Sequence, residues 1–434
     1  MVNLNEKLIE FLNYSHSEYH SVNKTRGILL ENGFVELDER QKFNLIPGGK
    51  YFVVRNLTSL IAFIVPKTID DLYFKMVASH ADSPTFKIKE NPVLIDKNYE
   101  KLKVEGYGGM IHSVWLDKPL SMAGRIVVKT KSGLESRLID VDKDLLIIPN
   151  VAIHQNREIN GGYKYSIQKD LCPIIGETLT EGTNYDNELD SFLKEDEKLI
   201  ATDLYLYNRA KANYIGSKKD FLGSPKLDDL ASAFLTLEGF IDSYVKDGIA
   251  VYYLANNEEV GSLTMNGADS TFLSDTLRRI TFAFNFDEEM YYQAIAKSIL
   301  ISADNAHAIH PNSPELSDNK NFCLLNKGVV IKHNANMFYT TDALSSSLIK
   351  EISNENDLPY QEFFNHSDVR GGSTLGNISN SHVSVLAVDI GLPQLAMHSN
   401  FELIGTKDIE TMYKLIKEFM SKSIKFEHGL IKFN

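Results

Sequence analysis

The sequence predicts an α/β protein in which a β-rich block interrupts the main domain. In residues 1–85 and 222–434, short apolar, β-prone runs alternate with segments of helical periodicity, as is typical of buried strands in an α/β sheet. Residues 86–221 consist instead of short β-prone pieces separated by turn signals. A chain of 434 residues also favours two domains over one. We therefore expect a discontinuous α/β domain, 1–85 with 222–434, and an inserted β-rich domain, 86–221.

The expected elements follow in chain order. An N-terminal helical segment closes at Asn32-Gly33, and the runs at 51–55 and 59–65 are separated by Asn56, which predicts a hairpin. Apolar runs that predict buried strands are 72–78, 248–254, 299–303 and 394–397. The polar stretch 180–198 indicates a loop or a disordered excursion. Helical spacing of apolar residues predicts helices over 227–244 and between Ile409 and Met420.

Composition excludes several classes of function. The formal net charge of −13 argues against a nucleic-acid partner, because little would neutralise phosphates. No apolar run reaches the roughly 18–20 residues of a membrane span, and the N-terminus lacks a basic region followed by an apolar core, so no secretory signal is expected. The two cysteines, Cys172 and Cys323, are far apart. This usage fits a reducing cytoplasm and a metal site without thiolates.

Five separated clusters carry the residue types that bind divalent metals. Four of them directly follow an apolar run, and open α/β sheets bind ligands at the carboxyl ends of their strands. Two metals about 3.5–4 Å apart stabilise a hydrolytic transition state from two sides and lower the pKa of a bound water. A set of His and carboxylate ligands suits zinc and would also accept cobalt or manganese. The sequence therefore predicts a metallohydrolase that uses His80, Asp228, the pair Glu258-Glu259, Asp304 and His398.

Each cluster has an ordinary alternative interpretation. Asp82, two residues after His80, is expected to accept the imidazole N–H that faces away from the metal, although a His-x-Asp at a strand end is more often a surface pair. A lone Asp at the position of Asp228 is more often a helix N-cap. In the pair Glu258-Glu259, one carboxylate can coordinate while its neighbour acts as general base. The alternative is a solvated acidic pair.

The motifs SHADSP, SPKLDDL, NNEEVGS, SADNAHAIHPN, KHNAN, GGSTLG and MHSNFE together resemble the M18 metallopeptidases, the aspartyl aminopeptidase and aminopeptidase I family. The resemblance runs nearly end to end. It implies a zinc-exopeptidase-like α/β sandwich with an inserted β-rich dimerisation domain. It also implies homodimers that assemble into a tetrahedral dodecamer, and the removal of N-terminal residues from peptide substrates.

Carried over residue by residue, the resemblance implies two zinc ions per subunit. One would be held by His80, Asp228 and Asp304, and the other by Asp228, Glu259 and His398. It also implies Glu258 as the general base and a cis Asp228–Asp229 peptide. The chain departs from the family pattern at Asn256 and at Asp229, neither of which is an expected ligand.

The resemblance is less specific about the substrate. Lys332 matches a lysine that pairs with an acidic N-terminal side chain, and His154 matches a histidine that reaches a neighbouring subunit's active site. His310 and Gly372, the latter in the loop 371–376, are expected to line the same pocket. A solvated lysine and a turn histidine are the ordinary alternatives for Lys332 and His154. Acidic and neutral or hydrophobic N-terminal residues both remain open.

Two other functions compete with this interpretation. A different co-catalytic zinc hydrolase, such as an N-acyl amino acid deacylase or a carboxypeptidase, would share the ligand order but not the KHNAN and AHAIHPN motifs. A metal-free assembly or cargo protein would retain only the fold. The complete set of ligand types and the accompanying base argue against a metal-free protein.

Overall fold

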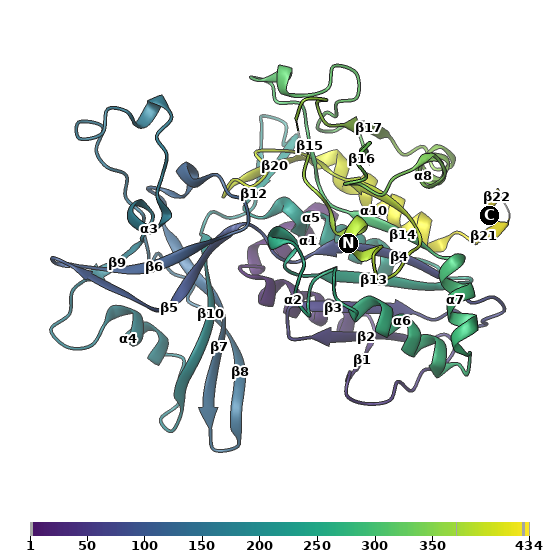
Figure 1. Ribbon diagram of the computed structural model, residues 1–434, viewed down its shortest axis with the longest axis horizontal. Coiled ribbons are helices and arrows are strands. Elements are labelled where there is room, and N and C mark those ends of the chain that lie inside the picture. Colours follow the sequence, from purple (N-terminus) through teal and green to yellow (C-terminus); the bar gives the residue numbers. More distant parts are fainter. Residues whose placement is uncertain (1–2, 370, 428–429, 434) are drawn as a thin grey trace.

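The computed structural model describes residues 3–369, 371–427 and 430–433, which form two lobes (Figure 1). The larger lobe contains a mixed nine-stranded sheet with helices on both faces, so the predicted α/β class is confirmed. In spatial order its strands are β1 (Val35–Leu37), β2 (Lys50–Arg55), β3 (Ser59–Ile64), β13 (Ile249–Ala255), β4 (Phe74–His80), β14 (Ile299–Ala303), β18 (Leu386–Gly391), β16 (Val329–His333) and β17 (Tyr360–Phe364).

The centre of this sheet consists of parallel strands that are buried along their whole length. Strand β4 pairs in parallel with both β13 and β14, and every residue of the three strands is buried. Strands covered on both faces carry continuous apolar runs, which is why the runs at 72–78, 248–254 and 299–303 predicted them. Because the strands are parallel and in register, with His80 opposite Ala255, their carboxyl ends lie at one edge.

Two layers of helices cover the sheet. One face packs against α1 (Leu4–Tyr14), α2 (Glu18–Glu31), α5 (Leu227–Ile241), α8 (Ala343–Glu355) and α10 (Thr406–Ser421). The other packs against α6 (Phe272–Ala283), α7 (Glu288–Ala296) and α9 (Leu375–Ser379). The predicted N-terminal helical segment is two helices, and the predicted hairpin turns at Asn56 and Leu57, both at positive φ. None of the helices in the described part of the chain has the length and apolar character to span a bilayer.

A separate five-stranded sheet lies next to the carboxyl edge of the main sheet. It is formed by β11 (Asn213–Ile215), β12 (Phe221–Ser224), β20 (Glu402–Gly405), β19 (Pro393–Leu395) and β15 (Ala306–His307). His398 was expected to follow a strand of the main sheet, and this expectation is wrong. The preceding strand, β19, pairs antiparallel with β20, and the chain turns back between them with Ala396 and His398 at positive φ.

The smaller lobe is built on a six-stranded antiparallel sheet with a core of its own. Its order is β8 (Gly133–Asp140), β7 (Leu120–Thr130), β10 (Lys198–Asn208), β5 (Thr85–Asp96), β6 (Tyr99–Tyr107) and β9 (Ile174–Glu177), accompanied by α3 (Ile167–Asp170). The sheet ends at Asn208, and β11 belongs to the five-stranded sheet instead. The exact division of the chain into domains stays a prediction. A hairpin of β21 (Ile424–Glu427) and β22 (Leu430–Phe433) ends the described chain.

The stretch 180–198 is not a disordered excursion. It contains α4 (Asn184–Asp190), whose N-cap Thr183 accepts a hydrogen bond from the Asp186 N–H. Tyr185 and Leu189 lie one helical turn apart and are both buried in the core of the smaller lobe. Residues on either side of this helix do form loops, but the disordered alternative was wrong because two correctly spaced apolar residues are enough to dock a short helix, even in a polar stretch.

The close contact between α5 and α10 gives a test of this packing. A Cβ added at Gly239 of α5 would lie 2.9 Å from both Ile416 Cβ and the Tyr413 carbonyl oxygen. We expect Gly239→Ala to lower the free energy of unfolding by about 1–3 kcal/mol through overpacking. Gly27 of α2 has no neighbour within 4 Å of an added Cβ, so Gly27→Ala should raise it by about 0.5–1 kcal/mol. Urea unfolding of both variants measures the difference, and equal shifts would contradict the packing argument.

Candidate metal centre

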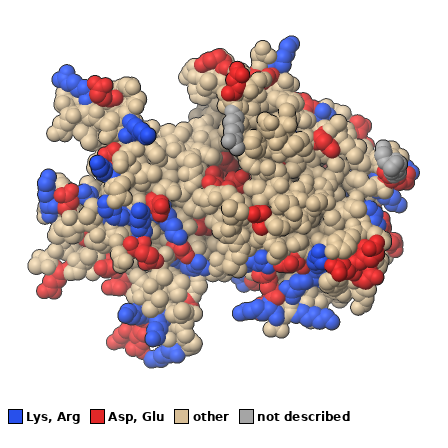
Figure 2. Space-filling model, in the orientation of Figure 1, with Lys and Arg blue, Asp and Glu red and all other residues tan. Residues whose placement is uncertain are grey.

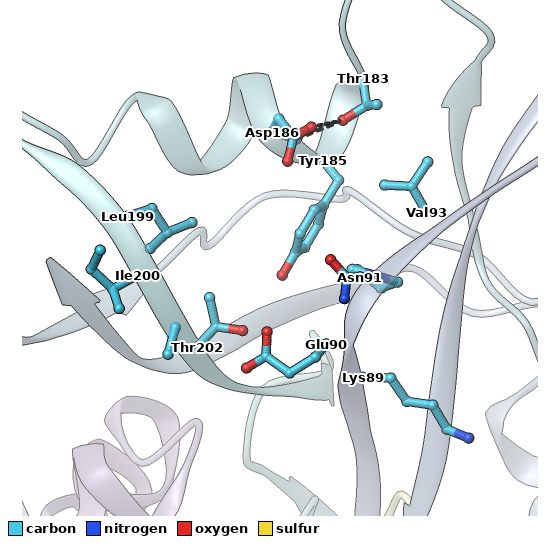
Figure 3. Close-up of a pocket in the computed structure, with 12 residues that line it drawn as sticks. Lys89, Glu90, Asn91, Val93, Thr183, Tyr185, Asp186, Leu199, Ile200 and Thr202 are labelled. Carbon is cyan, nitrogen blue, oxygen red and sulfur yellow. Dashed lines mark hydrogen bonds between the residues drawn. The ribbon is translucent and has the colours of Figure 1, made fainter.

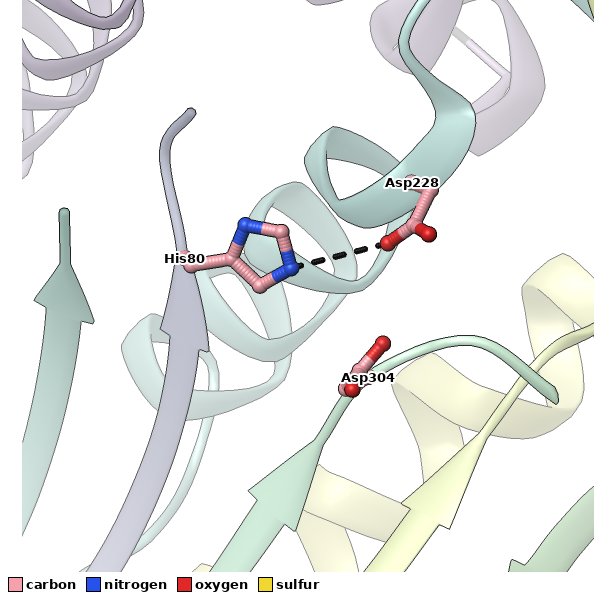
Figure 4. A group of neighbouring side chains, drawn as sticks. All are labelled: His80, Asp228 and Asp304. Atoms are coloured by element: carbon pink, nitrogen blue, oxygen red, sulfur yellow. Dashed lines mark ion pairs between the residues drawn. The ribbon is translucent and has the colours of Figure 1, made fainter. Parts of the chain in front are cut away.

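The residues predicted as metal ligands meet at one place, at the carboxyl edge of the main sheet. His80 ends β4, Asp304 follows β14, and Asp228 lies at the start of α5; their side chains point toward one another (Figure 4). Three groups of side chains have ligand atoms that all lie within 4.8 Å of one another: His80, Asp228 and Asp304; His80, Glu258 and Glu259; and Asp228, Glu259 and His398. The structure therefore brings together the five expected ligands and the expected base. A group of acidic side chains is visible near the middle of the face in Figure 2.

Asp228 lies between the two histidines and presents a different oxygen to each. Its Oδ1 is 3.5 Å from His80 Nε2, and its Oδ2 is 3.4 Å from His398 Nε2. His398 Nε2 is also 3.4 Å from Glu259 Oε2. These separations exceed usual hydrogen-bond lengths, whereas two ligands of a tetrahedral zinc, each about 2.1 Å from the ion, lie about 3.4 Å apart. The spacing thus fits a metal ion between the atoms better than direct hydrogen bonds.

Unpartnered atoms support the same interpretation. Among the described residues, Asp228 Oδ1 and Glu259 Oε1 are buried without a hydrogen-bond partner. Buried polar atoms are normally paired, and an orphaned carboxylate oxygen calls for an explanation such as an ion. Both atoms belong to the residues that the sequence predicted as ligands, so the donor set fits zinc.

Main-chain carbonyl groups orient both histidines. His80 Nδ1 lies 3.0 Å from the Asp82 carbonyl oxygen, and His398 Nδ1 lies 2.5 Å from the Gly109 carbonyl oxygen. A carbonyl oxygen only accepts, so each Nδ1 donates, and each Nε2 faces the cluster, where it would offer its lone pair to a metal ion. The sequence predicted this arrangement for His80 but gave the accepting role to the Asp82 carboxylate. That carboxylate is farther away, with Oδ1 3.4 Å from Nδ1.

Two buried carboxylates fix the backbone of the cluster instead. Asp82 Oδ1 and Oδ2 accept the N–H groups of Glu258 and Glu259, each at 3.2 Å. Glu402 Oε2 accepts the Asp228 N–H at 3.0 Å, and its Oε1 accepts the His398 N–H at 2.8 Å. Sequence reasoning gave Glu402 no role, although it stands in the motif MHSNFE. Its position four residues after His398 was the available signal.

The start of α5 departs from helical geometry at the cluster. The Asp228–Asp229 peptide is cis, which confirms the expectation, and neither residue has helical φ and ψ. The Asp228 carboxylate faces the two histidines, so it is not used as the N-cap of a regular helix. Asp229 is fully buried and its Oδ2 accepts the backbone N–H of His80 at 3.2 Å.

The crowding of acidic groups is reflected in their titration. Burial, with Asp304 and Asp82 nearby, raises the pKa of Glu258 to about 8, and burial also raises the pKa of Glu259 and of Asp304. For His398, burial opposes the charged form, but Asp228 and Glu259 outweigh it and raise the pKa to about 10. The protein alone therefore holds extra protons in the cluster. Divalent cations would replace those protons, as expected for a metal centre.

Lys332 lies behind Asp304 rather than in an open pocket. It is 2% exposed, and its Nζ donates to the carbonyl oxygens of Asp304 and Asn305 at 2.9 and 3.2 Å. The same Nζ lies 3.4 Å from Asp304 Oδ2. Lys332 is thus neither a solvated lysine nor, in the contacts of this structure, a partner for a substrate side chain. It holds Asp304 in place.

The remaining expected residues lie outside the cluster. His310 and Gly372 line a cavity of about 300 Å³ together with His307, Phe363 and Met397, the last of which precedes His398. His154 is exposed, lies between β8 and α3 of the smaller lobe, and is not among the side chains whose ligand atoms meet in the cluster. Within one chain, His154 therefore does not join the cluster.

A second cavity, of about 330 Å³, lies in the smaller lobe between β5, β10 and α4 (Figure 3). Tyr185, Glu90 and Thr202 are among the side chains that line it. It is lined by the carboxylates Glu90 and Asp186 but by no histidine, so it lacks the mixed imidazole and carboxylate set of the predicted metal site.

The comparisons with known proteins agree on one family. A family model described as aminopeptidase I zinc metalloprotease (M18) matches residues 11–420. A probable M18 family aminopeptidase 2 of Clostridium acetobutylicum is 43% identical over 422 residues, which cover 95% of this chain and 98% of the relative. A structure of the Ape4 and Nbr1 complex contains a similar chain, with a TM-score of 0.91, 32% identity, and coverage of 96% of this chain and 85% of that one. The S. cerevisiae mApe1 dodecamer gives a TM-score of 0.83 and 26% identity, with 96% of each chain covered.

The role of Glu402 can be tested by replacing it with glutamine. The amide retains one accepting oxygen, so the N–H of either Asp228 or His398 loses its partner. We expect Glu402→Gln to weaken zinc binding about 10–100-fold, the usual effect of removing a group that orients metal ligands. Glu238, a buried carboxylate of α5 that pairs with Lys7, supplies the control Glu238→Gln. Competition with a chromophoric chelator measures both affinities, and equal affinities would refute the assignment.

Proposed function

The chain belongs to the M18 family of zinc metalloproteases and is a metallo-aminopeptidase, and we propose that it removes N-terminal residues from peptides with two zinc ions and with Glu258 as general base. The observation that carries this proposal is the placement of Asp228, whose two oxygens face His80 and His398 separately. One carboxylate placed in this way can serve two ions.

The two groups that share Asp228 define the proposed zinc positions. His80, Asp228 and Asp304 would hold one ion, and Asp228, Glu259 and His398 the other. Each group combines one imidazole with two carboxylates, which leaves a coordination position open for substrate or water. Lys332 supports the first group through Asp304, and Gly109 supports the second through His398.

Zinc bound at these positions would polarise the scissile carbonyl group and make an attacking water more acidic. Glu258 lies beside both groups, since its carboxylate is within 4.8 Å of ligand atoms of His80 and Glu259. Its carboxylate takes a proton from the attacking water and delivers it to the leaving amino group. Asp82 holds the Glu258 backbone in place for this transfer.

Fewer contacts in the structure bear on which N-terminal side chain the enzyme prefers in its substrates. The acidic preference implied by the resemblance depends on Lys332, whose ammonium group is committed to Asp304 and Asn305. The contacts of Lys332 therefore give no support to an acidic preference. We propose that the N-terminal side chain enters the cavity lined by His310 and Gly372. A panel of amino-acid p-nitroanilides, including aspartyl and leucyl compounds, measures the preference.

Glu258→Gln tests the general base. The amide cannot accept a proton, so we expect kcat to fall about 10²–10⁴-fold while zinc content and melting temperature stay unchanged. Glu259→Gln is the matched comparison, because loss of a ligand should reduce zinc content. Activity of the wild type should disappear with a chelator and return with zinc. Retained activity in Glu258→Gln would refute the assignment of the base, and hydrolysis only of N-acyl or C-terminal substrates would favour the competing zinc hydrolases.

Assembly is the second part of the proposal. We propose that the chain forms homodimers within a tetrahedral dodecamer, supported by its similarity to the S. cerevisiae mApe1 dodecamer. His154 is exposed on the smaller lobe and outside the cluster of its own chain, which supports a role at a neighbour's active site. There its imidazole would donate a hydrogen bond to the developing oxyanion.

His154→Ala tests this role in the assembly. We expect kcat to fall about 10²–10³-fold, the usual effect of losing one oxyanion donor, with zinc content unchanged. Gln155→Ala, a neighbouring exposed position, should retain activity. A dilution series followed by light scattering should show activity falling as subunits dissociate. A fully active monomer would contradict the role of His154.

A further inference from the structure

The loop that follows β6 of the smaller lobe lies directly against the candidate metal centre of the larger lobe. This loop, residues 108–111, together with Tyr107 at the end of β6, is called here the β6 loop. The Gly109 carbonyl oxygen accepts from His398 Nδ1, and the Ile111 N–H donates to the His398 carbonyl oxygen at 3.1 Å. Gly108 packs so closely on Glu259 that an added Cβ would lie 3.1 Å from Glu259 Cβ. Two of the expected ligands are therefore in contact with the smaller lobe of their own chain.

Tyr107 extends this contact to the general base. Its hydroxyl donates to Asp82 Oδ2 at 2.7 Å and accepts from Asn257 Nδ2 at 2.9 Å. The same Asp82 carboxylate accepts the N–H groups of Glu258 and Glu259. The Tyr107 ring is held by an edge-to-face contact with Tyr205 of β10, with the ring centroids 5.6 Å apart. A continuous chain of contacts thus runs from the six-stranded sheet to the backbone of Glu258.

The buried position of Asp82 makes the tyrosine hydroxyl important. Asp82 is 1% exposed, so its charge depends on hydrogen bonds from the protein. The bond from Tyr107 is its shortest, and an O–H donor to a carboxylate is stronger than a neutral pair. Without this donor, Asp82 Oδ2 keeps only the longer bond from the Glu259 N–H. The carboxylate would then be held only by the two longer bonds from the Glu258 and Glu259 N–H groups, and the backbone of these two residues would be fixed less firmly.

We propose that the β6 loop is a positioning element of the metal centre and that Tyr107 is its positioning residue. The proposal rests on the function proposed for the cluster. Tyr107 is not one of the side chains of the cluster; it acts through Asp82 on the general base and on one expected zinc ligand. The smaller lobe consequently shapes the active site of its own chain, apart from any role in assembly.

Tyr107→Phe removes the hydroxyl and keeps the ring packing. We expect zinc affinity, measured against a chromophoric chelator, to weaken about tenfold. With zinc saturating, kcat on an amino-acid p-nitroanilide should fall while KM changes less, because the base is displaced rather than the substrate site. Tyr185→Phe is the control: it removes a hydroxyl from a buried tyrosine of the same lobe that is not part of the cluster. If zinc affinity and kcat are the same in the two variants, the proposal is wrong.

A glycine pair provides a second test that does not depend on Tyr107→Phe folding. Gly108 and Gly33 have similar positive φ angles of 72° and 78°, so an alanine is strained equally at both. Only at Gly108 does the new Cβ meet Glu259, because Gly33 has no neighbour within 4 Å. Zinc affinity should fall in Gly108→Ala and remain unchanged in Gly33→Ala; equal affinities would overturn the proposal. Failure of the wild type to bind zinc would instead refute the function proposed for the cluster.

Discussion

Mutual repulsion among carboxylates is the constraint on which the rest of this structure depends. Asp228, Glu258, Glu259 and Asp304 converge in a space that burial makes unfavourable for charge. Such a cluster of carboxylates is stable only if the backbone fixes each side chain in place against the repulsion of the others. Cations must then offset the charge when the site is in use. Much of the surrounding structure either fixes the carboxylates in place or leaves room for cations between them.

Three parts of the fold share the work of holding the carboxylates. Parallel strands β4, β13 and β14 bring His80, Glu258 and Asp304 to one edge. The five-stranded sheet supplies the approaches to Asp228 and His398, and Glu402 of β20 ties those two residues to each other. The β6 loop of the smaller lobe closes the third side. Because these elements are far apart in sequence, the geometry of the site is a property of the whole chain.

The sequence pattern was sufficient to predict the central strands and the membership of the cluster, whereas the cis peptide was implied only by the resemblance to the family. Periodicity and apolar runs report burial, and a buried strand that ends in a ligand type places that ligand at a sheet edge. The same signals do not show which sheet a short run joins, so the strand before His398 was assigned to the main sheet. They also carry no information about main-chain hydrogen-bond acceptors, so they do not predict that the carbonyl groups of Asp82 and Gly109 accept from the two histidines. These signals give no role to the β6 loop, because its contacts are made by backbone, by the lack of a side chain at Gly108 and by a single hydroxyl.

The shared carboxylate of Asp228 has a thermodynamic consequence. If one oxygen of Asp228 serves each ion, the two sites cannot be filled independently, because the first ion fixes the carboxylate and withdraws part of its charge from the second. By linkage, the second ion alters the affinity for the first to the same extent. Metal content would then not rise as the sum of two separate isotherms. The enzyme would pass through a singly loaded state whose population depends on how strongly the two sites are coupled. The fraction of active molecules would then depend on metal concentration more steeply, or more gradually, than the binding curve of a single site.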